Sequence, residues 1–546
     1  MLRTRIGWRA GAWLGATAVA LATLAATTTA ATATAATRPG TTAAATVRTS
    51  GGVVQGKTSG ATREFLGIPY AAPPVGSLRW QPPQPAAPWA GVRDATRFGA
   101  NCAQPPGLPF GIGSTSENCL FLNVYAPAGA QPAGGRPVLV WIHGGGLWLG
   151  EGQDYDPTEL AADGAIVVTI NYRLGALGFL AHPALAGRPG GPSGNYGLMD
   201  QQAALRWVQR NIGQFGGNSR NVTIAGESAG GLSVLAQLAS PGAHGLFDRA
   251  IVESGDFALT QTPLSTAEAA GKVFAATAGC SDQTAACLRR LPVSTILADQ
   301  GTSGYTPAVV DGQVLKQSIG SALSSGNFNH VPVINGSNRD EQRLFVAIGL
   351  SINAGHTTAL ANSPVTAANY QATIASTLGV SASQAAAIAA RYPLSAYASA
   401  PIAFSALDTD QNFACPALQV DKWTSRFVPT FAYEFNDENA PERFLDPASF
   451  DFGAAHESEL QYLFGLPNPP TPFAGTLTAA QQRLASAMRH DWTSFAASGG
   501  PSSPGQVAWP VFTSQGQRML SLVPPQPKVE TDFSAAHQCG FWSSVG

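Results

Sequence analysis

The stretch Val222-Thr223-Ile224-Ala225-Gly226-Glu227-Ser228-Ala229-Gly230-Gly231 decides the fold of this chain. It starts with β-branched and small apolar residues, which favour a buried strand, and the helix-compatible run Leu232–Ala239 follows it. The join between them is a G-x-S-x-G pattern, the only one in the sequence. A strand that turns sharply into a helix needs small residues around the turn, and the turn pushes its central serine out above the sheet. The stretch therefore predicts that Ser228 is a nucleophile at the carboxyl end of a strand.

A second glycine-rich turn, His143-Gly144-Gly145-Gly146, follows the apolar run Val138–Ile142. A nucleophile that attacks an acyl carbon generates an oxyanion, which needs preorganised N–H donors about 2.7–3.1 Å away. Consecutive glycines allow such a close approach because no Cβ stands in the way. A phosphate-binding loop is the alternative, but no G-K-[ST] follows, and His143 is interpreted as structural. We therefore predict that the oxyanion donors are the N–H groups of Gly145, Gly146 and Ala229.

Short apolar runs alternate with helical patterns along most of the chain. Continuous runs of this length suit parallel strands that are buried on both faces. Their alternation with helices predicts an α/β fold, in which a large, mostly parallel sheet carries helices on both faces. The chemistry of such sheets lies at the carboxyl ends of the strands. The predicted strands are Val138–Ile142, Ile166–Ile170, Val222–Ala225, Ala250–Val252, Val331–Ile334 and Thr430–Phe435.

The acid that supports the serine is expected after it in the sequence, and the histidine base is expected last. Both Asp340 and Glu341 follow the predicted strand Val331–Ile334, and their spacing alone does not separate them. His456 lies in a loop after the predicted strand Thr430–Phe435, where the base is expected. The segment that begins at His456 reads His-Glu-Ser-Glu, but the zinc motif H-E-x-x-H is absent and no ligand cluster is evident, so no metal site is expected.

The N-terminus has the order of a secretory signal peptide: a basic start, an apolar core and small-x-small cleavage sites near Ala31–Ala35. The strongly apolar part is about 15 residues long, which is short for a bilayer that needs roughly 20. We therefore expect a signal peptide at residues 1–35, a flexible linker at 36–46 and one catalytic domain at 47–546. The mature protein is expected to be secreted, without a stable membrane anchor. The sequence carries no signal for an oligomeric state.

The composition argues against two classes of protein, and the number of cysteines suggests disulfide bonds. Hydrophobic residues make up 45% of the chain, charged residues 12%, and the formal net charge is −2. Intrinsic disorder needs low hydrophobicity, and nucleic-acid binding needs a strong basic field, so neither is expected. Six cysteines allow 15 pairings, and an exported protein can keep disulfides. Proximity in the sequence suggests Cys102–Cys119 and Cys280–Cys287, which leaves Cys415 with Cys539.

With these residues in place, the chain resembles the type B carboxylesterases, which are the carboxylesterase/cholinesterase family of α/β-hydrolases. The bacterial para-nitrobenzyl esterases are the nearest kind, and the resemblance covers nearly all of Val47 to Trp542. Its landmarks occur in order along the chain. They are Phe65–Ala71 with Pro73-Pro74, Leu78–Trp80 with Pro82-Pro83, Ser116–Val124, Asn171–Arg173 with Gly178-Phe179, and Gly194-Asn195 with Gly197-Leu198 and Asp200-Gln201.

The resemblance implies an α/β-hydrolase fold and a serine carboxylesterase that acts on small-molecule esters and needs no cofactor. It places the acid on Glu341, in preference to Asp340, and the base on His456. Glu227 and Glu459 resemble buried acids that tune the base. The resemblance also implies the same three cysteine pairs, and it implies structural salt bridges between Arg79 and Glu117 and between Arg173 and Asp200.

This sequence departs from the family pattern at three places. Asn118 replaces the Asp of the usual Glu-Asp-Cys-Leu, and Gln342 replaces the Gly that follows the acid. Cholinesterases place a Trp in the loop between the first two cysteines to hold choline by a cation–π contact. No Trp occurs between Cys102 and Cys119, so hydrolysis of choline esters is not expected.

Two other functions fit the same scaffold. A lipase or polyester hydrolase would use the same chemistry with a different pocket. A non-catalytic binding or adhesion protein would need no triad, because a fold by itself does not fix function. The presence of Ser228, Glu341 and His456 together favours the enzyme.

Overall fold

A computed structural model describes residues 44–106, 112–187, 191–301, 308–348, 365–443, 445, 450–466 and 475–545. The chain divides into two units, Met1–Thr41 and Thr42–Gly546, and every described residue belongs to the second. The expected signal peptide, residues 1–35, lies outside the described residues. Strand β1 (Ala44–Thr49) pairs antiparallel with β2 (Gly52–Ser59), and Ala44 lies opposite Lys57. Residues 44–46, which we expected in the linker, therefore belong to a sheet because β2 supplies their hydrogen-bond partners.

The described unit is built on a 13-stranded sheet with the order β1-β2-β3-β5-β7-β6-β8-β9-β12-β13-β14-β15, and β4 pairs with β2. All neighbours from β7 to β14 run parallel, and β2 also pairs in parallel with β4. The other pairs are antiparallel. The further strands are β3 (Thr62–Pro69), β4 (Val92–Asp94), β5 (Phe121–Pro127), β6 (Arg136–Ile142), β7 (Ile166–Ile170), β8 (Gly217–Glu227), β9 (Arg249–Glu253), β12 (Val333–Asn338), β13 (Thr430–Phe435), β14 (Met519–Leu522) and β15 (Lys528–Glu530).

The predicted strands of the parallel centre are confirmed, with one shift. The run predicted at Val331–Ile334 starts two residues later and continues to Asn338 as β12. The prediction ended the strand too early because it relied on apolar residues, whereas the second half of β12 is polar. These residues, Asn335, Ser337 and Asn338, are buried and lie opposite residues of β13, so the ladder continues through them.

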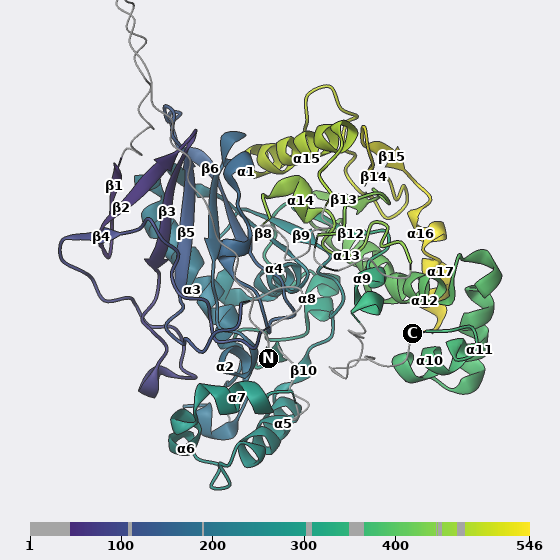
Figure 1. The fold of residues 1–546 in the computed structure, drawn as a ribbon, viewed down its shortest axis with the longest axis horizontal. Coiled ribbons are helices and arrows are strands. Elements are labelled where there is room, and N and C mark those ends of the chain that lie inside the picture. The colour runs from purple at the N-terminus through teal and green to yellow at the C-terminus, as the bar shows by residue number, and fades with distance from the viewer. Residues whose placement is uncertain are drawn as a thin grey trace, which may run out of the picture. The chain divides into compact units, whose positions relative to one another are not determined.

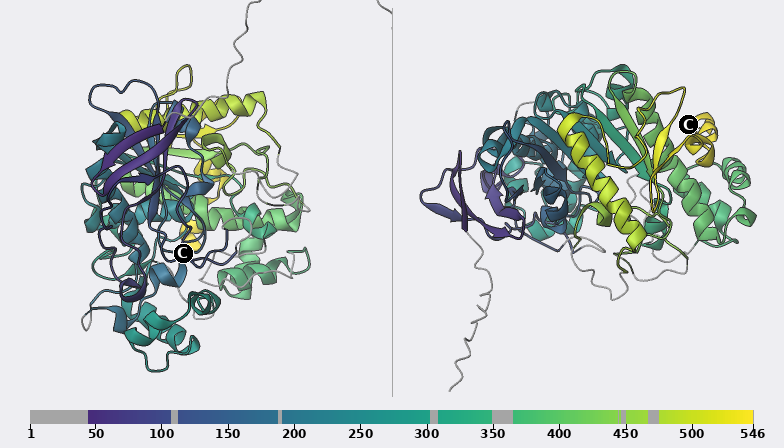
Figure 2. Two further views of the ribbon diagram at one scale, coloured as in Figure 1. Left: turned by 60° about the vertical axis from the view of Figure 1, so that its left-hand side comes forward. Right: turned by 90° about the horizontal axis from the view of Figure 1, so that it is seen from above.

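Helices cover both faces of the sheet (Figures 1 and 2). Alternate residues of β6 show the two faces, because Val140 and Ile142 belong to one apolar cluster whereas Leu139 and Trp141 belong to another. The first cluster includes residues of α3 (Tyr196–Asn211), α4 (Ala229–Ala239) and α8 (Ile319–Ser325). The second includes residues of α1 (Thr158–Ala162), α14 (Leu460–Leu463) and α15 (Ala479–Ser498). This arrangement is the α/β fold with helices on both faces that the sequence predicts.

The remaining helices gather outside these layers (Figure 1). At the bottom of the view are α5 (Leu264–Thr277), α6 (Ala285–Arg290) and α7 (Val293–Asp299), close to α2 (Gly175–Phe179). At the right are α9 (Gln342–Ala347), α10 (Tyr370–Leu378), α11 (Ala382–Arg391), α12 (Ala400–Thr409), α16 (Phe533–Ala536) and α17 (Cys539–Val545). Helix α13 (Cys415–Thr424) packs instead on β12 and β13, and its Val420 belongs to the first apolar cluster. Across the described ranges, no individual helix has the length and apolarity to span a bilayer, and only the bent pair Tyr370–Leu378 and Ala382–Ala396 passes that test together.

The three expected disulfides are all present, joining Cys102 to Cys119, Cys280 to Cys287 and Cys415 to Cys539. The two expected salt bridges are present as well. Arg79 contacts Glu117 at 2.5 Å, and Arg173 contacts Asp200 at 2.7 Å with both side chains buried.

Candidate active site

Ser228 lies at the sharp turn between β8 and α4. Its φ of 56° and ψ of −125° are a backbone conformation that residues other than glycine rarely adopt. Glycine is required two positions after it, because a Cβ at Gly230 would lie 2.0 Å from the carbonyl oxygen of Ile142. The backbone N–H of Ser228 donates to the carbonyl of Glu253 at 2.8 Å, and the residue is 7% exposed. Strain of this kind persists where the surrounding structure holds it, and such positions cluster at active sites.

The glycine loop after β6 lies against this serine. A Cβ at Gly144 would be 3.1 Å from the Cβ of Ser228. Gly145 and Gly146 both have positive φ, 91° and 65°, which suits glycine. A Cβ at Gly145 would also collide with the carbonyl oxygen of Leu149, at 2.3 Å. Within the described parts of the chain, no hydrogen bond is recorded for the N–H of Gly145, Gly146 or Ala229, so these donors are free to face a ligand.

His143, at the start of this loop, is packed into the core. It is fully buried, its ring stacks on Tyr172 with centroids 4.4 Å apart, and burial lowers its pKa to about 4. The hydroxyl of Tyr172 donates to the carbonyl oxygen of His143 at 2.8 Å. These contacts agree with the structural role that the sequence suggested for His143.

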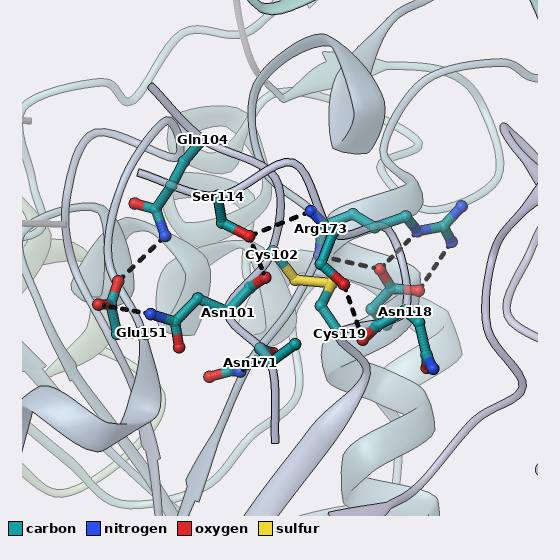
Figure 3. Close-up of a disulfide and its surroundings, with 12 residues drawn as sticks. Asn101, Cys102, Gln104, Ser114, Asn118, Cys119, Glu151, Asn171 and Arg173 are labelled. Carbon is teal, nitrogen blue, oxygen red and sulfur yellow. Dashed lines mark hydrogen bonds and ion pairs between the residues drawn. A yellow bond between two sulfur atoms is a disulfide. The ribbon is translucent and has the colours of Figure 1, made fainter. Parts of the chain in front are cut away.

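The segment around the Cys102–Cys119 disulfide holds Gly150 and Glu151, which follow the glycine loop (Figure 3). Glu151 is buried and accepts hydrogen bonds from the side-chain amides of Asn101 at 2.9 Å and Gln104 at 3.0 Å. Gln104 in turn accepts from the N–H of Gly150 at 2.8 Å. The Cys102–Cys119 bond closes this segment and so holds these amides in place. Sequence reasoning missed Glu151, because a lone glutamate after a glycine loop gives no sign that it is buried.

The structure separates the two candidate acids. Glu341 is buried, its Oε2 lies 2.5 Å from Nδ1 of His456, and its Oε1 accepts from the N–H of Asn338 at 2.7 Å. Asp340 instead pairs with Arg343 at 2.7 Å and accepts from the N–H of Ala454 at 3.0 Å. Glu341 is therefore the acid that contacts the histidine.

The other ring nitrogen of His456 faces the serine side of the site. Nε2 lies 3.0 Å from Oε1 of Glu227, but the two atoms are not aligned as a hydrogen bond. Among the described contacts there is also no hydrogen bond between Nε2 and Oγ of Ser228. Such bonds are often long in the absence of substrate. Phe345 and Phe413 flank the imidazole, with ring centroids 4.8 Å and 5.2 Å from it.

Further buried carboxyl groups surround His456. Glu227, Glu253 and Glu459 are 0% exposed, and Glu457 is 6% exposed. Burial raises the pKa of Glu227 well above its ordinary value, and repulsion from Glu457 adds to this. Burial and then repulsion from Glu459 raise the pKa of Glu457, and the pKa of Glu459 is raised to about 8 by burial and by Glu341. Sequence reasoning identified Glu227 and Glu459 but missed Glu253 and Glu457.

The backbone of Glu457 has an unusual conformation. Its φ is 69°, in the left-handed region, and a glutamate is uncommon there. Ligand atoms of Glu227, His456 and Glu457 lie within 4.8 Å of one another. This is a group that could hold a metal ion, although the sequence pattern predicted none.

Comparisons with known proteins find relatives that cover most of the chain. A family model described as the carboxylesterase family matches residues 43–542. Fumonisin B1 esterase of Sphingopyxis macrogoltabida is 36% identical over 492 residues, which are 86% of this chain and 85% of that protein. Acylcarnitine hydrolase of Mus musculus is 36% identical over 512 residues, 89% of this chain and 88% of that protein. Para-nitrobenzyl esterase of Bacillus subtilis (strain 168) is 34% identical over 498 residues, 87% of this chain and 94% of that protein.

Proposed function

The chain belongs to the carboxylesterase family and is a carboxylic ester hydrolase, and from that premise we propose that hydrolysis proceeds through Ser228, His456 and Glu341. The oxyanion donors in this proposal are the N–H groups of Gly145, Gly146 and Ala229. The substrates are small-molecule esters.

In the first half of the reaction, Nε2 of His456 takes the proton of Ser228 while Oγ attacks the ester carbonyl. The carbonyl oxygen becomes an oxyanion, which the three N–H groups stabilise. Glu341 accepts a hydrogen bond from Nδ1–H, holds the imidazole in the required tautomer and stabilises the imidazolium. The imidazolium then protonates the leaving alcohol, and an acyl-enzyme remains on Ser228.

In the second half, water replaces the alcohol. His456 takes a proton from the water as the water attacks the acyl-enzyme, and the same oxyanion donors act again. The imidazolium returns the proton to Oγ of Ser228, and the carboxylic acid leaves. No cofactor takes part in either half.

The observation that carries the proposal is the 2.5 Å contact between Nδ1 of His456 and Oε2 of Glu341, with both residues buried. A histidine held through Nδ1 leaves Nε2 available, and Nε2 lies 3.0 Å from Oε1 of Glu227, the residue that precedes Ser228.

The test is Ser228→Ala, compared with the matched control Ser254→Ala. Ser254 is also a buried serine with positive φ, 50°, at the end of the neighbouring strand β9. Ser228→Ala is expected to lower kcat on a short p-nitrophenyl ester by several orders of magnitude with the fold retained. An organophosphonate is expected to label Ser228 in the parent and in Ser254→Ala, and to label Ser228→Ala at no site. More than a few per cent residual activity in Ser228→Ala, or activity without labelling of Ser228, sinks the assignment.

We also propose that the protein is secreted after removal of an N-terminal signal peptide at about residue 35. The three disulfides support this proposal, since such bonds persist in oxidising compartments. The test is N-terminal sequencing of protein from the culture medium, with Leu21→Arg as the variant that disrupts the apolar core. Full-length protein retained in the cells, or export of the variant at the parent's level, contradicts the proposal.

A further inference from the structure

Three buried side chains meet on the Nε2 side of the catalytic histidine. Oε1 of Glu227 is 3.0 Å from Nε2 of His456, and ligand atoms of Glu227, His456 and Glu457 all lie within 4.8 Å of one another. They are 0%, 2% and 6% exposed. Both carboxylate oxygens of Glu227, Oε2 of Glu457 and Nε2 of His456 lack a hydrogen-bond partner among the described residues.

The histidine is already oriented as a metal ligand would be. Metal-binding histidines usually donate their second ring N–H to a carboxylate, which fixes the tautomer and leaves the other nitrogen free to coordinate. Here Nδ1 lies 2.5 Å from Oε2 of Glu341. The lone pair of Nε2 therefore faces Glu227 and Glu457.

The charged groups that surround Glu227 and Glu457 most closely are other carboxyl groups. The charged groups that act most strongly on Glu227 are Glu457, Glu459, Glu341 and Glu253. Those that act most strongly on Glu457 are again carboxyl groups. Buried charges in proteins are normally paired with an opposite charge or coordinate a metal. No Lys or Arg is among these strongest charged neighbours, so a bound cation would offset the repulsion between the carboxylates.

The backbone holds Glu457 in the cluster at a cost. Its φ of 69° is strained for a residue with a Cβ, and such strain costs on the order of 1–3 kcal/mol. A glycine would fit the same backbone without strain. The fold therefore presents a carboxylate here in spite of the local preference of the chain.

We infer that Glu227, His456 and Glu457 bind one divalent cation, and that Zn²⁺ is the best match. Zn²⁺ takes nitrogen and carboxylate oxygen ligands at about 2.0–2.2 Å, commonly with three protein ligands and one open position. Tetrahedral ligands at such lengths lie about 3.4 Å apart. The Nε2–Oε1 distance of 3.0 Å is already close to that value, and a carboxylate oxygen of Glu457 lies within 4.8 Å of the ligand atoms of the other two residues.

Occupation of the site inhibits the esterase. Nε2 of His456 cannot accept the proton of Ser228 while its lone pair is on a metal. The inhibition rests on the proposed function, whereas metal binding does not, so the two are measured separately.

Binding is measured by equilibrium dialysis of chelator-treated Ser228→Ala protein against ZnSO4, with metal analysis. Glu457→Gln and Glu457→Gly are made in the same background, and Glu159→Gln is the control, since Glu159 is an exposed carboxylate with 66% side-chain exposure. The expected result is one Zn²⁺ per chain for Ser228→Ala and for the Glu159 control. Both Glu457 variants are expected to bind at least tenfold more weakly.

Inhibition is measured with otherwise unsubstituted protein and with each Glu457 variant, every rate being normalised to the same protein in a chelator. Zn²⁺ is expected to inhibit the parent over the concentration range in which it binds, and at least tenfold higher Zn²⁺ is needed in both variants. Mg²⁺, which prefers octahedral oxygen coordination, is expected to inhibit neither.

Three outcomes overturn the inference: no stoichiometric Zn²⁺ on Ser228→Ala, unchanged binding in both Glu457 variants, or equal inhibition by Mg²⁺. Because Glu457→Gly relieves backbone strain, at least one variant is expected to fold normally. Activity retained by Ser228→Ala would instead count against the proposed function and leave the binding result to decide this site.

Discussion

Nδ1 of His456 lies 2.5 Å from Oε2 of Glu341, although the two residues are 115 positions apart in the sequence. The loop that carries His456 is held against Glu341 by backbone hydrogen bonds: the N–H of His456 donates to the carbonyl of Glu341 at 3.3 Å, and the N–H of Asp340 donates to the carbonyl of Ala454 at 2.9 Å. Asp340, one position earlier, turns away toward Arg343 and the N–H of Ala454. The role of the acid therefore depends on which of two adjacent carboxylates the backbone directs inward.

Glu341→Gln should lower kcat far more than Asp340→Asn. The glutamine keeps the size of the side chain but removes the charge that stabilises the imidazolium, and a comparable change in a serine triad costs about 10⁴-fold. Asp340→Asn removes the ion pair with Arg343, which does not contact His456, so most activity should remain. The measurement is kcat on a short p-nitrophenyl ester for both variants. A larger loss in Asp340→Asn would show that the acid is misassigned.

The sequence could supply most of the fold and the positions of Ser228, Glu341 and His456. Strand and helix periodicity, glycine placement and motif order are local signals, and the structure agrees with the fold that they predict. The residues themselves left Asp340 and Glu341 open, because side-chain direction after a strand depends on packing. Glu457 and Glu253 were missed for a related reason. A glutamate is mostly exposed in proteins, and no local pattern reports that these two are buried.

Glu457→Gly should raise the stability of the protein, whereas Glu457→Ala should raise it less. Both changes remove a buried carboxyl, but only glycine relieves the φ of 69°. The difference is expected to be about 1 kcal/mol. Thermal unfolding of both variants in the presence of a chelator measures it. If alanine proves as stable as glycine, the left-handed backbone at this position is not strained.

His537 should make stability fall as the pH rises from neutral toward 10. It lies between α16 and α17 and contacts Asp410 and Glu434, each at 2.6 Å. Burial lowers the pKa of His537, but the bonds to the two carboxylates outweigh it and raise the pKa to about 10. The raised pKa means that the stabilisation is complete below the unfolded value near 6.5 and is lost as the pH approaches 10, with a total on the order of a few kcal/mol.

The slope of stability against pH should be shallower in His537→Gln than in the parent. Glu530, which also interacts with His537, has its pKa raised to about 7 by burial and by Glu434. The contribution of Glu530 to the pH dependence of stability therefore lies mostly below pH 7. The pKa of Glu459, raised to about 8, also falls in this range, so the contribution of His537 is the difference between the slopes of unfolding temperature against pH, from pH 7.5 to 9.5, in the parent and in His537→Gln. His490→Gln is the control, because His490 is a half-buried residue of α15 that bonds only within its helix among the described contacts. A parent-like slope in His537→Gln would contradict the assignment.

Loss of the Cys415–Cys539 bond should destabilise the protein more than loss of the Cys280–Cys287 bond. The two bonds span 124 and 7 positions. A cross-link limits the unfolded chain more when its loop is longer, and the chain-entropy model gives about 5 and about 2 kcal/mol for loops of these sizes. The comparison uses Cys415→Ser/Cys539→Ser and Cys280→Ser/Cys287→Ser in thermal unfolding without reductant. His537 holds the same C-terminal segment through Asp410 and Glu434, so the first pair should keep a native fold while it melts earlier. Equal losses in the two pairs would show that native packing around each bond, and not loop length, sets its contribution.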